Sequence, residues 1–315
     1  MSKLYSHIRQ MLSPSCGEHE ARAIAFVLLD DVCGLSRTDV LMDRDDELDE
    51  PTRQCILSLA QRIADGEPLQ YVTGTALFDG LKVGVAPGVL IPRPETEELV
   101  AAVSQPVLPA GTVVIDVCSG SGCIALALKH RMPQTVVVGV DVSEPALAIA
   151  ADNAVRLGLD VDFRKMDVLN DAEWDPLAVW LATATADGWD CKQTETTNTG
   201  RHVGLIVSNP PYVCDSERED MESLVLDHEP HIALFVPDAD PLLFYRTITR
   251  NAHRLLMDGG VLAFEINRRF GAEVAQLLRD EGFSGVGVMQ DAFGNDRIVT
   301  GVWHLSEKRK VKSEK

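Results

Sequence analysis

From residue 112 to residue 122 the chain reads Thr-Val-Val-Ile-Asp-Val-Cys-Ser-Gly-Ser-Gly, a β-branched run that passes into a turn of small residues. Residues 123–129 then favour a helix. Small side chains let a bound molecule approach the backbone, and the free N–H groups at a helix start face it. The pattern alone also fits a plain tight turn. A P-loop or dinucleotide site is disfavoured, because Gly-Lys-Ser/Thr is missing and the G-x-G-x-x-G spacing fails.

Strand and helix patterns alternate on both sides of this stretch. Such alternation is typical of a mainly parallel sheet with helices on both faces, so we expect an α/β, Rossmann-like fold. We expect the last two strands to form an antiparallel pair at the sheet edge. The predicted strands are residues 112–117, 135–140, 161–165, 204–208, 260–266, 285–289 and 297–303, and the clearest helices are 123–129 and 145–157.

Composition changes divide the chain into further segments. We predict a helical domain over residues 1–75, a hairpin and linker over 76–110, the α/β domain over 111–305 and a disordered basic tail over 306–315. An acidic connection between two helices is expected at 39–50, with a recognition surface for a basic partner as the alternative. Thr96 is expected to cap the helix that begins near Glu95. An insertion at about 171–202 should hold one amphipathic helix and a polar loop.

Charge and cysteine usage exclude several classes of protein. The chain of 315 residues has a formal net charge of −19, and an acidic chain without a segregated basic face is repelled by nucleic-acid phosphates. The seven cysteines are odd in number and form no C-x-x-C pair, so we expect reduced thiols and no zinc site. His228 and His231 are expected to be surface residues rather than metal ligands. With neither a signal pattern nor a long apolar run, a cytoplasmic protein is expected.

Asp141 follows the second predicted strand, in the sequence Gly139-Val-Asp141. It lies 141 − 122 = 19 residues beyond Gly122, close to the spacing of about twenty expected for an acid that binds ribose hydroxyls. A carboxylate at the end of a strand accepts two hydrogen bonds from a diol and so positions a nucleoside. By itself, Asp141 could also be a charge at a helix start; beside the glycine turn, nucleoside binding is favoured.

The tetrapeptide Asn209-Pro210-Pro211-Tyr212 directly follows a strand that reads as buried. The two prolines keep the backbone extended and donate no N–H, so the carbonyl of Pro210 is left to accept. The side-chain oxygen of Asn209 is a second acceptor. Together they can bind both hydrogens of one –NH₂ group while Tyr212 lies against its flat face. A structural turn is the alternative; the position after a strand favours a site for a planar nitrogen.

With these motifs the sequence resembles the protein-(glutamine-N5) methyltransferases that modify peptide chain release factors, over about residues 5–303. The most distinctive stretch is Gly66-Glu-Pro-Leu-Gln-Tyr71, followed by Phe78, Gly80-Leu81 and Pro87-Gly-Val-Leu-Ile-Pro-Arg-Pro-Glu-Thr-Glu-Glu98. The Asn-Pro-Pro-Tyr motif is shared with N6-adenine DNA methyltransferases. This upstream block is not, and it favours the release-factor enzymes.

The resemblance implies a helical domain that binds the release factor and a catalytic domain that uses S-adenosylmethionine to methylate the glutamine of a Gly-Gly-Gln loop. It assigns Asn209, Pro210 and Tyr212 to catalysis and, with Pro211, to the glutamine amide; Arg93, Glu95 and Thr96 would lie in a loop over the site. The cofactor would contact Cys118, Ser119, Gly120, Ser121, Gly122, Asp141, Val168 and Asn209.

Two features depart from the family pattern. The family turn begins Gly-Thr-Gly, whereas this chain has Cys118-Ser119-Gly120, which raises the question of whether position 118 needs a positive φ. The insertion at 171–202 is also longer than expected. Two alternatives remain: an N6-adenine nucleic-acid methyltransferase, against which the acidic charge argues, and a silent methyltransferase fold that serves as a binding module, against which Asp141 and the intact tetrapeptide argue.

Overall fold

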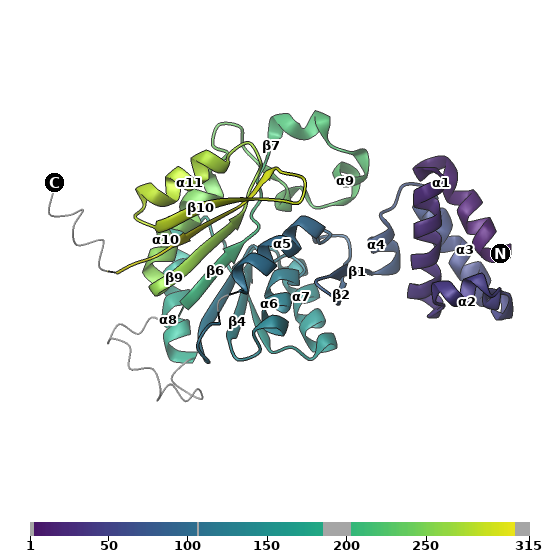
Figure 1. Ribbon diagram of the computed structural model, residues 1–315, viewed down its shortest axis with the longest axis horizontal. Helices are drawn as coiled ribbons and strands as arrows, with labels where there is room; N and C mark the ends of the chain where they lie inside the picture. Colours follow the sequence, from purple (N-terminus) through teal and green to yellow (C-terminus); the bar gives the residue numbers. More distant parts are fainter. Residues whose placement is uncertain (1–2, 106, 185–202, 306–315) are drawn as a thin grey trace. The chain divides into compact units, whose positions relative to one another are not determined.

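The computed structural model describes residues 3–105, 107–184 and 203–305, without the side chains of 182–184. Within it the chain forms two compact units (Figure 1). We call the first the helical unit; it comprises Met1–Ala76, Val85–Pro87 and Glu222–Glu229. The second, the sheet unit, comprises Leu77–Gly84, Gly88–Met221 and Pro230–Lys315. The expected tail at 306–315 and the later part of the expected insertion lie outside the described residues.

The helical unit has its own apolar core, formed mainly by the two longest helices, with residues such as Ile8, Leu28 and Ile56 fully buried. Gly17, with φ 80°, interrupts the first helix and divides it into two helical stretches. The helices of this unit are α1 (Lys3–Cys33), α2 (Arg37–Leu41), η1 (Arg44–Glu47), α3 (Glu50–Ala64), α4 (Leu69–Thr73) and α9 (Ser223–His228).

The acidic connection at 39–50 is more ordered than a solvated linker. Ser36 and Asp39 form a capping box at the start of α2, and Asp49 caps α3 through Thr52 N–H. Asp45 is fully buried, and its carboxylate accepts a hydrogen bond from Tyr5 N–H in the first turn of α1. Burial raises the pKa of Asp45. Part of this acidic run therefore ties helix starts together.

The sheet unit is built on seven strands in the order β10-β11-β9-β6-β3-β4-β5. Five are parallel, and β10 and β11 form the expected antiparallel pair at one edge. The mainly parallel α/β fold is confirmed. The strands are β3 (Val113–Val117), β4 (Val136–Asp141), β5 (Val161–Lys165), β6 (Val203–Ser208), β9 (Leu256–Glu265), β10 (Ser284–Gln290) and β11 (Asp296–Val302). Two small sheets add β1 (Thr75–Phe78) with β2 (Leu81–Gly84), and β7 (Val213–Cys214) with β8 (Phe235–Val236).

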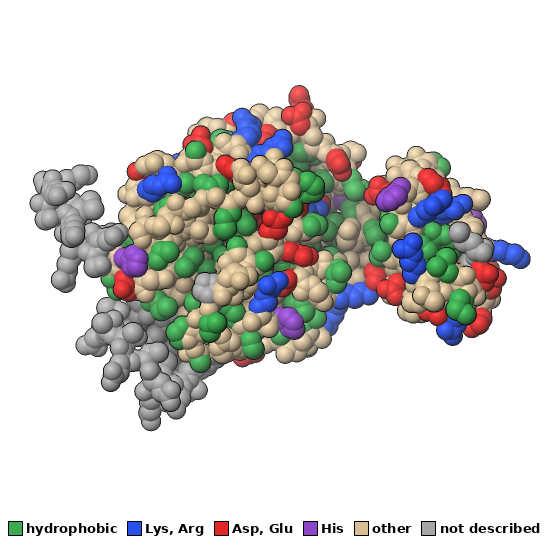
Figure 2. All heavy atoms as spheres, in the orientation of Figure 1, with side chains coloured by type: hydrophobic (Ala, Val, Ile, Leu, Met, Phe, Trp, Pro, Cys, Tyr) green, Lys and Arg blue, Asp and Glu red, His purple; other side chains and the backbone are tan. Residues whose placement is uncertain are grey.

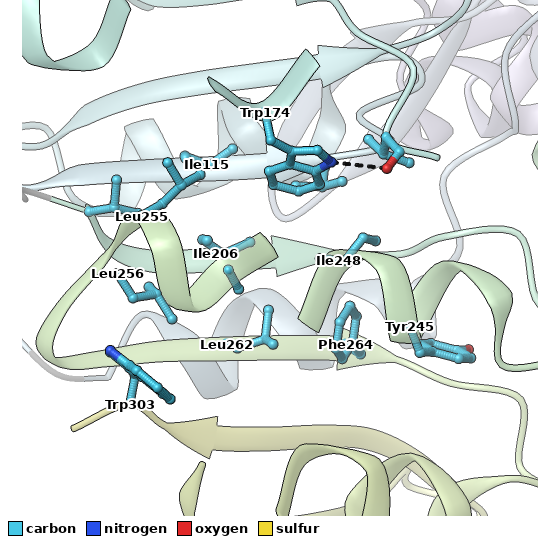
Figure 3. Packing of buried hydrophobic residues seen from close by; sticks show 14 of the residues in the cluster. Ile115, Trp174, Ile206, Tyr245, Ile248, Leu255, Leu256, Leu262, Phe264 and Trp303 are labelled. Carbon is cyan, nitrogen blue, oxygen red and sulfur yellow. Dashed lines mark hydrogen bonds between the residues drawn. The ribbon is translucent and has the colours of Figure 1, made fainter. Parts of the chain in front are cut away.

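Helices cover both faces of this sheet (Figure 1). On one face α5 (Pro94–Val103), α6 (Cys123–Arg131) and α7 (Glu144–Leu157) pack over alternate strand residues such as Val114 and Leu205. On the other, α8 (Trp174–Ala184), α10 (Leu243–Leu255) and α11 (Gly271–Asp280) pack over Ile115 and Ile206. Figure 3 shows this second core, where Trp174 Nε1–H donates to the carbonyl of Val168 at 3.0 Å.

One local expectation was wrong and one was partly tested. Thr96 does not cap α5: Arg93 occupies the N-cap, and Thr96 is three residues further on, inside the first turn, with its hydroxyl turned to Glu265 instead. Pro94 at the first helical position begins the helix earlier than the carboxylates suggested. The expected helix of the 171–202 insertion is α8; its polar loop lies outside the described residues.

Candidate active site

A cavity of about 270 Å³ opens at the edge of the sheet where the parallel strands β3, β4 and β6 end. This edge is where open α/β sheets bind ligands, because loops that leave the strand ends diverge there. The lining is mostly apolar, with the carboxylates of Asp141 and Asp167 and the amide of Asn209 among it. It consists of Gly88, Val89, Leu90, Cys118, Gly120, Asp141, Val142, Ser143, Ala146, Met166, Asp167, Val168, Leu169, Asn209, Pro211, Ile232, Ala233 and Phe244.

The small-residue turn after β3 is forced into left-handed backbone at three positions. Cys118, Gly120 and Gly122 have φ of 64°, 54° and 79°. A Cβ at Gly122 would lie 2.7 Å from the Phe163 ring, so glycine is needed there for space as well as for φ. Position 118 therefore does need a positive φ, and the cysteine adopts it at a cost that glycine would not have.

Not every residue of the turn faces the cavity. Cys118 and Gly120 line it, whereas Ser119, Ser121 and Gly122 hold the turn in place. The Ser119 hydroxyl donates to the Asp116 carbonyl at 2.9 Å, and Gly122 N–H donates to the Ser119 carbonyl at 2.8 Å.

Asn153 of α7 braces the same turn from behind. Its buried side chain accepts from Gly84 N–H at 2.7 Å and donates to the carbonyls of Gly84 and Ser121 at 2.9 and 3.0 Å. One amide thus joins the β2 strand to the small-residue turn. No pattern in the sequence singles out this asparagine, because its partners are backbone groups far away in the chain.

Asp141 is the last residue of β4 and is placed for contact with a ligand. One carboxylate oxygen accepts from Gly120 N–H at 2.8 Å, and the other accepts from Ser143 N–H at 2.9 Å. These bonds lock the carboxylate at the cavity wall, and each oxygen keeps capacity to accept a further hydrogen bond. Burial raises the pKa of Asp141, against the lowering effect of those backbone donors. Val168 and Met166 add an apolar wall beside it.

The Asn209-Pro-Pro-Tyr segment is held by a buried hydrogen-bond chain. Asn209 Nδ2 donates to Thr96 Oγ1 at 3.2 Å, and Thr96 Oγ1 donates to Glu265 Oε2 at 2.6 Å. Tyr212 Oη donates to Glu265 Oε1 at 3.1 Å. Because hydrogen-bond partners decide how an asparagine amide is turned, the Nδ2 bond leaves Asn209 Oδ1 free for a ligand. Asn209 and Pro211 line the cavity, and Pro210 and Tyr212 flank them.

Glu265 stands at the centre of this chain, and sequence reasoning missed it. It ends β9 with 1% exposure, and its pKa is raised mainly by burial, against the effect of the Thr96 and Tyr212 hydroxyls and of Arg297. Burial, together with the nearby Glu265 charge, also raises the pKa of Tyr212. The signal available in the sequence was a lone glutamate directly after the apolar run at residues 261–264.

Two further side chains support residues 209–212, which we call the amide clamp. Asn267 Nδ2 donates to the Tyr212 carbonyl at 3.2 Å and to Glu217 at 2.9 Å, and so ties the segment after the tetrapeptide to the end of β9. Arg297 of β11 pairs with the buried Asp291 at 3.1 Å and faces Glu265 and Tyr212. Among the described residues, no group of three or more His, Cys, Asp or Glu side chains could hold a metal ion, and His228 and His231 are exposed.

Comparison with known proteins identifies the family of this chain. A family model for the PrmC N-terminal domain matches residues 3–74, and a methyltransferase domain model matches residues 114–193. A release factor glutamine methyltransferase of Bacteroides thetaiotaomicron is 38% identical over 95% of this chain and 99% of its own length. This chain belongs to the release factor glutamine methyltransferase family.

A second relative and a solved structure are also similar to this methyltransferase. The release factor glutamine methyltransferase of Flavobacterium psychrophilum is 35% identical over 92% of this chain and 94% of its own length. A solved protein-(glutamine-N5) methyltransferase (release factor-specific) of Alicyclobacillus acidocaldarius is 26% identical and covers 70% of this chain and 98% of its own, with a TM-score of 0.40. The identities to the two release factor glutamine methyltransferases confirm the resemblance read from the sequence.

Proposed function

We propose that this protein transfers a methyl group from S-adenosylmethionine to the side-chain amide nitrogen of the glutamine in the Gly-Gly-Gln motif of peptide chain release factors. The observation that carries the proposal is the orientation of the Asn209 amide. Its Nδ2 group is committed to Thr96, so its oxygen meets a ligand that offers hydrogens. A primary amide offers two hydrogens on one flat group, and the names of the relatives specify glutamine.

The residues around the cavity suit the proposed cofactor. Asp141 would accept hydrogen bonds from the ribose diol, the open backbone of Cys118 and Gly120 would lie along the amino-acid part, and Val168 would contact the adenine ring. Ser119, Ser121 and Gly122 do not line the cavity, so their part in cofactor binding would be to shape this turn. Bound here, S-adenosylmethionine supplies an electrophilic methyl group and leaves as S-adenosylhomocysteine.

The tetrapeptide would position and activate the glutamine. Asn209 Oδ1 and the Pro210 carbonyl would each accept one amide hydrogen, while Pro211 and Tyr212 confine the planar group. Acceptors on both hydrogens orient the nitrogen and stabilise the positive charge that develops on it. The proton can then leave to water. Glu265 acts through Thr96 and Tyr212, so it is a positioning residue.

We assign the remaining roles by segment. Residues 1–75 would bind the release factor, 76–110 would form the hairpin and the loop that covers the site, and 111–305 would carry catalysis. Arg93 and Glu95 were expected in that loop, but Arg93 is the N-cap of α5 and Glu95 lies in its first helical turn, so the covering segment would end where α5 begins. Among the described residues, no helix has the length and apolar character to cross a bilayer. We propose the cytoplasm, where translation terminates, as the place of action.

Charge disfavours the alternative nucleic-acid substrate. The chain carries 29 basic and 48 acidic side chains. On the face drawn in Figure 2, acidic and basic side chains are intermixed. Clustered Lys and Arg bind a phosphate backbone by neutralising it and releasing its counterions into solution, so an acidic chain whose charges are intermixed on this face gains little from DNA or RNA there.

A methyl-transfer assay tests the proposal. The protein is incubated with labelled S-adenosylmethionine and, in separate reactions, with unmethylated release factor or unmethylated DNA. We expect label on the Gly-Gly-Gln glutamine, located by mass spectrometry of the digested factor. Label on DNA alone would establish the adenine alternative, and label on neither would favour a binding module.

A further inference from the structure

The turn between β10 and β11, residues 291–295, carries an exposed aromatic ring. Phe293 is 81% exposed. Single apolar residues on a surface are common, so exposure by itself decides nothing. What distinguishes this one is how rigidly it is presented and where it stands.

The turn is held by a buried carboxylate. Asp291, whose side chain is fully buried, accepts from Phe293 N–H at 3.0 Å, from Asn295 N–H at 2.9 Å and from the Arg297 guanidinium at 3.1 Å. In addition, Ala292 N–H donates to Glu98 of α5 at 3.2 Å. The ring is therefore presented by an ordered turn and can contact a partner with little further loss of conformational entropy.

The turn lies at the edge of the sheet that carries the active site. Strand β11 runs antiparallel to β9, and its Ile298 pairs with Glu265, the last residue of β9. The turn before β11 therefore extends beyond the strand ends from which the amide clamp is built. Arg297 connects the two, because it pairs with Asp291 and faces Glu265 and Tyr212.

We propose that Phe293 is a docking residue for the protein substrate, inserting its ring into an apolar depression of the folded domain that carries the reactive glutamine. This inference rests on the proposed function. The glutamine side chain alone is small and polar, so affinity has to come from contacts outside the cavity. A preorganised aromatic residue at the rim is the type of contact that dominates protein interfaces.

The chemistry of the turn favours a protein partner over a nucleic acid. Residues 290–296 read Gln-Asp-Ala-Phe-Gly-Asn-Asp, with two aspartates and no Lys, Arg or His. A nucleobase could stack on the exposed ring, but the exposed residues of this turn offer the neighbouring phosphates no basic group. An apolar depression on a folded domain needs no such group.

The test measures binding directly in the full-length protein. Unmethylated release factor is titrated by calorimetry into the wild type, Phe293→Ala and Val155→Ala, each saturated with S-adenosylhomocysteine. Val155 is the matched control, because it is 80% exposed but lies near the end of α7, whose first residues are at the active-site edge. We expect Phe293→Ala to weaken the release-factor Kd at least tenfold, and Val155→Ala to keep it within twofold.

The outcomes separate this inference from the proposed function. A Kd within twofold of wild type in Phe293→Ala, or an equal loss in Val155→Ala, overturns the docking role while methylation by the wild type still stands. A wild type that binds release factor through Phe293 but fails to methylate it removes the proposed function and leaves the docking role. If Phe293→Ala lowers Tm or S-adenosylhomocysteine affinity with unchanged release-factor Kd, the ring is structural and the inference is wrong.

Discussion

Thr96 Oγ1 donates a 2.6 Å hydrogen bond to Glu265 Oε2, across 169 positions of sequence. Because a hydroxyl has one hydrogen, this bond leaves the Thr96 oxygen as an acceptor, and Asn209 Nδ2 donates to it. The buried glutamate thereby determines, through one threonine, which end of the Asn209 amide faces the cavity.

Asn209→Ala should lose turnover far more than cofactor binding. The substitution removes an acceptor aimed at the reacting amide, and loss of one such preorganised group typically lowers kcat by about 10²–10³-fold. Steady-state kinetics with release factor, beside calorimetric binding of S-adenosylhomocysteine, would separate the two effects. Normal turnover in Asn209→Ala would refute the amide-clamp mechanism.

Thr96→Val should lower kcat by roughly thirtyfold, since it keeps the shape of the side chain but breaks both hydrogen bonds, each worth about 1 kcal/mol. Thr96→Ser, which restores the hydroxyl, should recover most of the activity. The two variants are compared at saturating release factor, with Tm as the measure of folding. Equal kcat in the valine and serine variants would mean that Thr96 does not orient Asn209.

Cys118→Gly should be more stable to urea than Cys118→Ala, by about 1 kcal/mol, because only glycine adopts the φ of 64° without strain. Both variants lose the thiol, so the comparison isolates the backbone. The free energy of unfolding is extrapolated from urea titrations of each. A more stable alanine variant would show that the turn relaxes out of the left-handed region.

Asp116 should make stability depend on pH. Burial raises its pKa from 3.8 to about 7, so between these values the folded protein binds more protons than the unfolded chain. Stability from this group is therefore lost as pH rises through that window. Asp116→Asn should remove a loss on the order of 2 kcal/mol between about pH 5 and about pH 8. Urea titrations at both pH values check this, with the exposed Asp160→Asn as control; an unchanged pH slope would contradict it.

The sequence predicted the sheet well because strand, turn and helix signals there are local. The β-branched run before Cys118 and the antiparallel pair of the last two strands both read directly from residue type. The small-residue turn, Asp141 and the Asn209 tetrapeptide could be placed at one edge, since parallel strands end together.

The sequence could not predict hydrogen bonds between residues that are far apart in the chain. Thr96 was expected at a helix cap because local spacing favours it, yet its hydroxyl is used by Glu265. Asn153, Arg297 and Glu265 look like ordinary surface or strand residues until the fold buries them. Burial is set by tertiary packing, and no window along the sequence reports it.

The segment Glu222–Glu229 limits how the protein can be cut into fragments that each contain one whole unit. It belongs to the helical unit although it is encoded within the sheet unit, and so does Val85–Pro87. A fragment that stops at residue 76 therefore lacks α9, and a fragment that starts at 77 carries α9 without the helices of its unit. A single cut in the reading frame after residue 76 therefore divides the helical unit itself as well as parting it from the sheet unit.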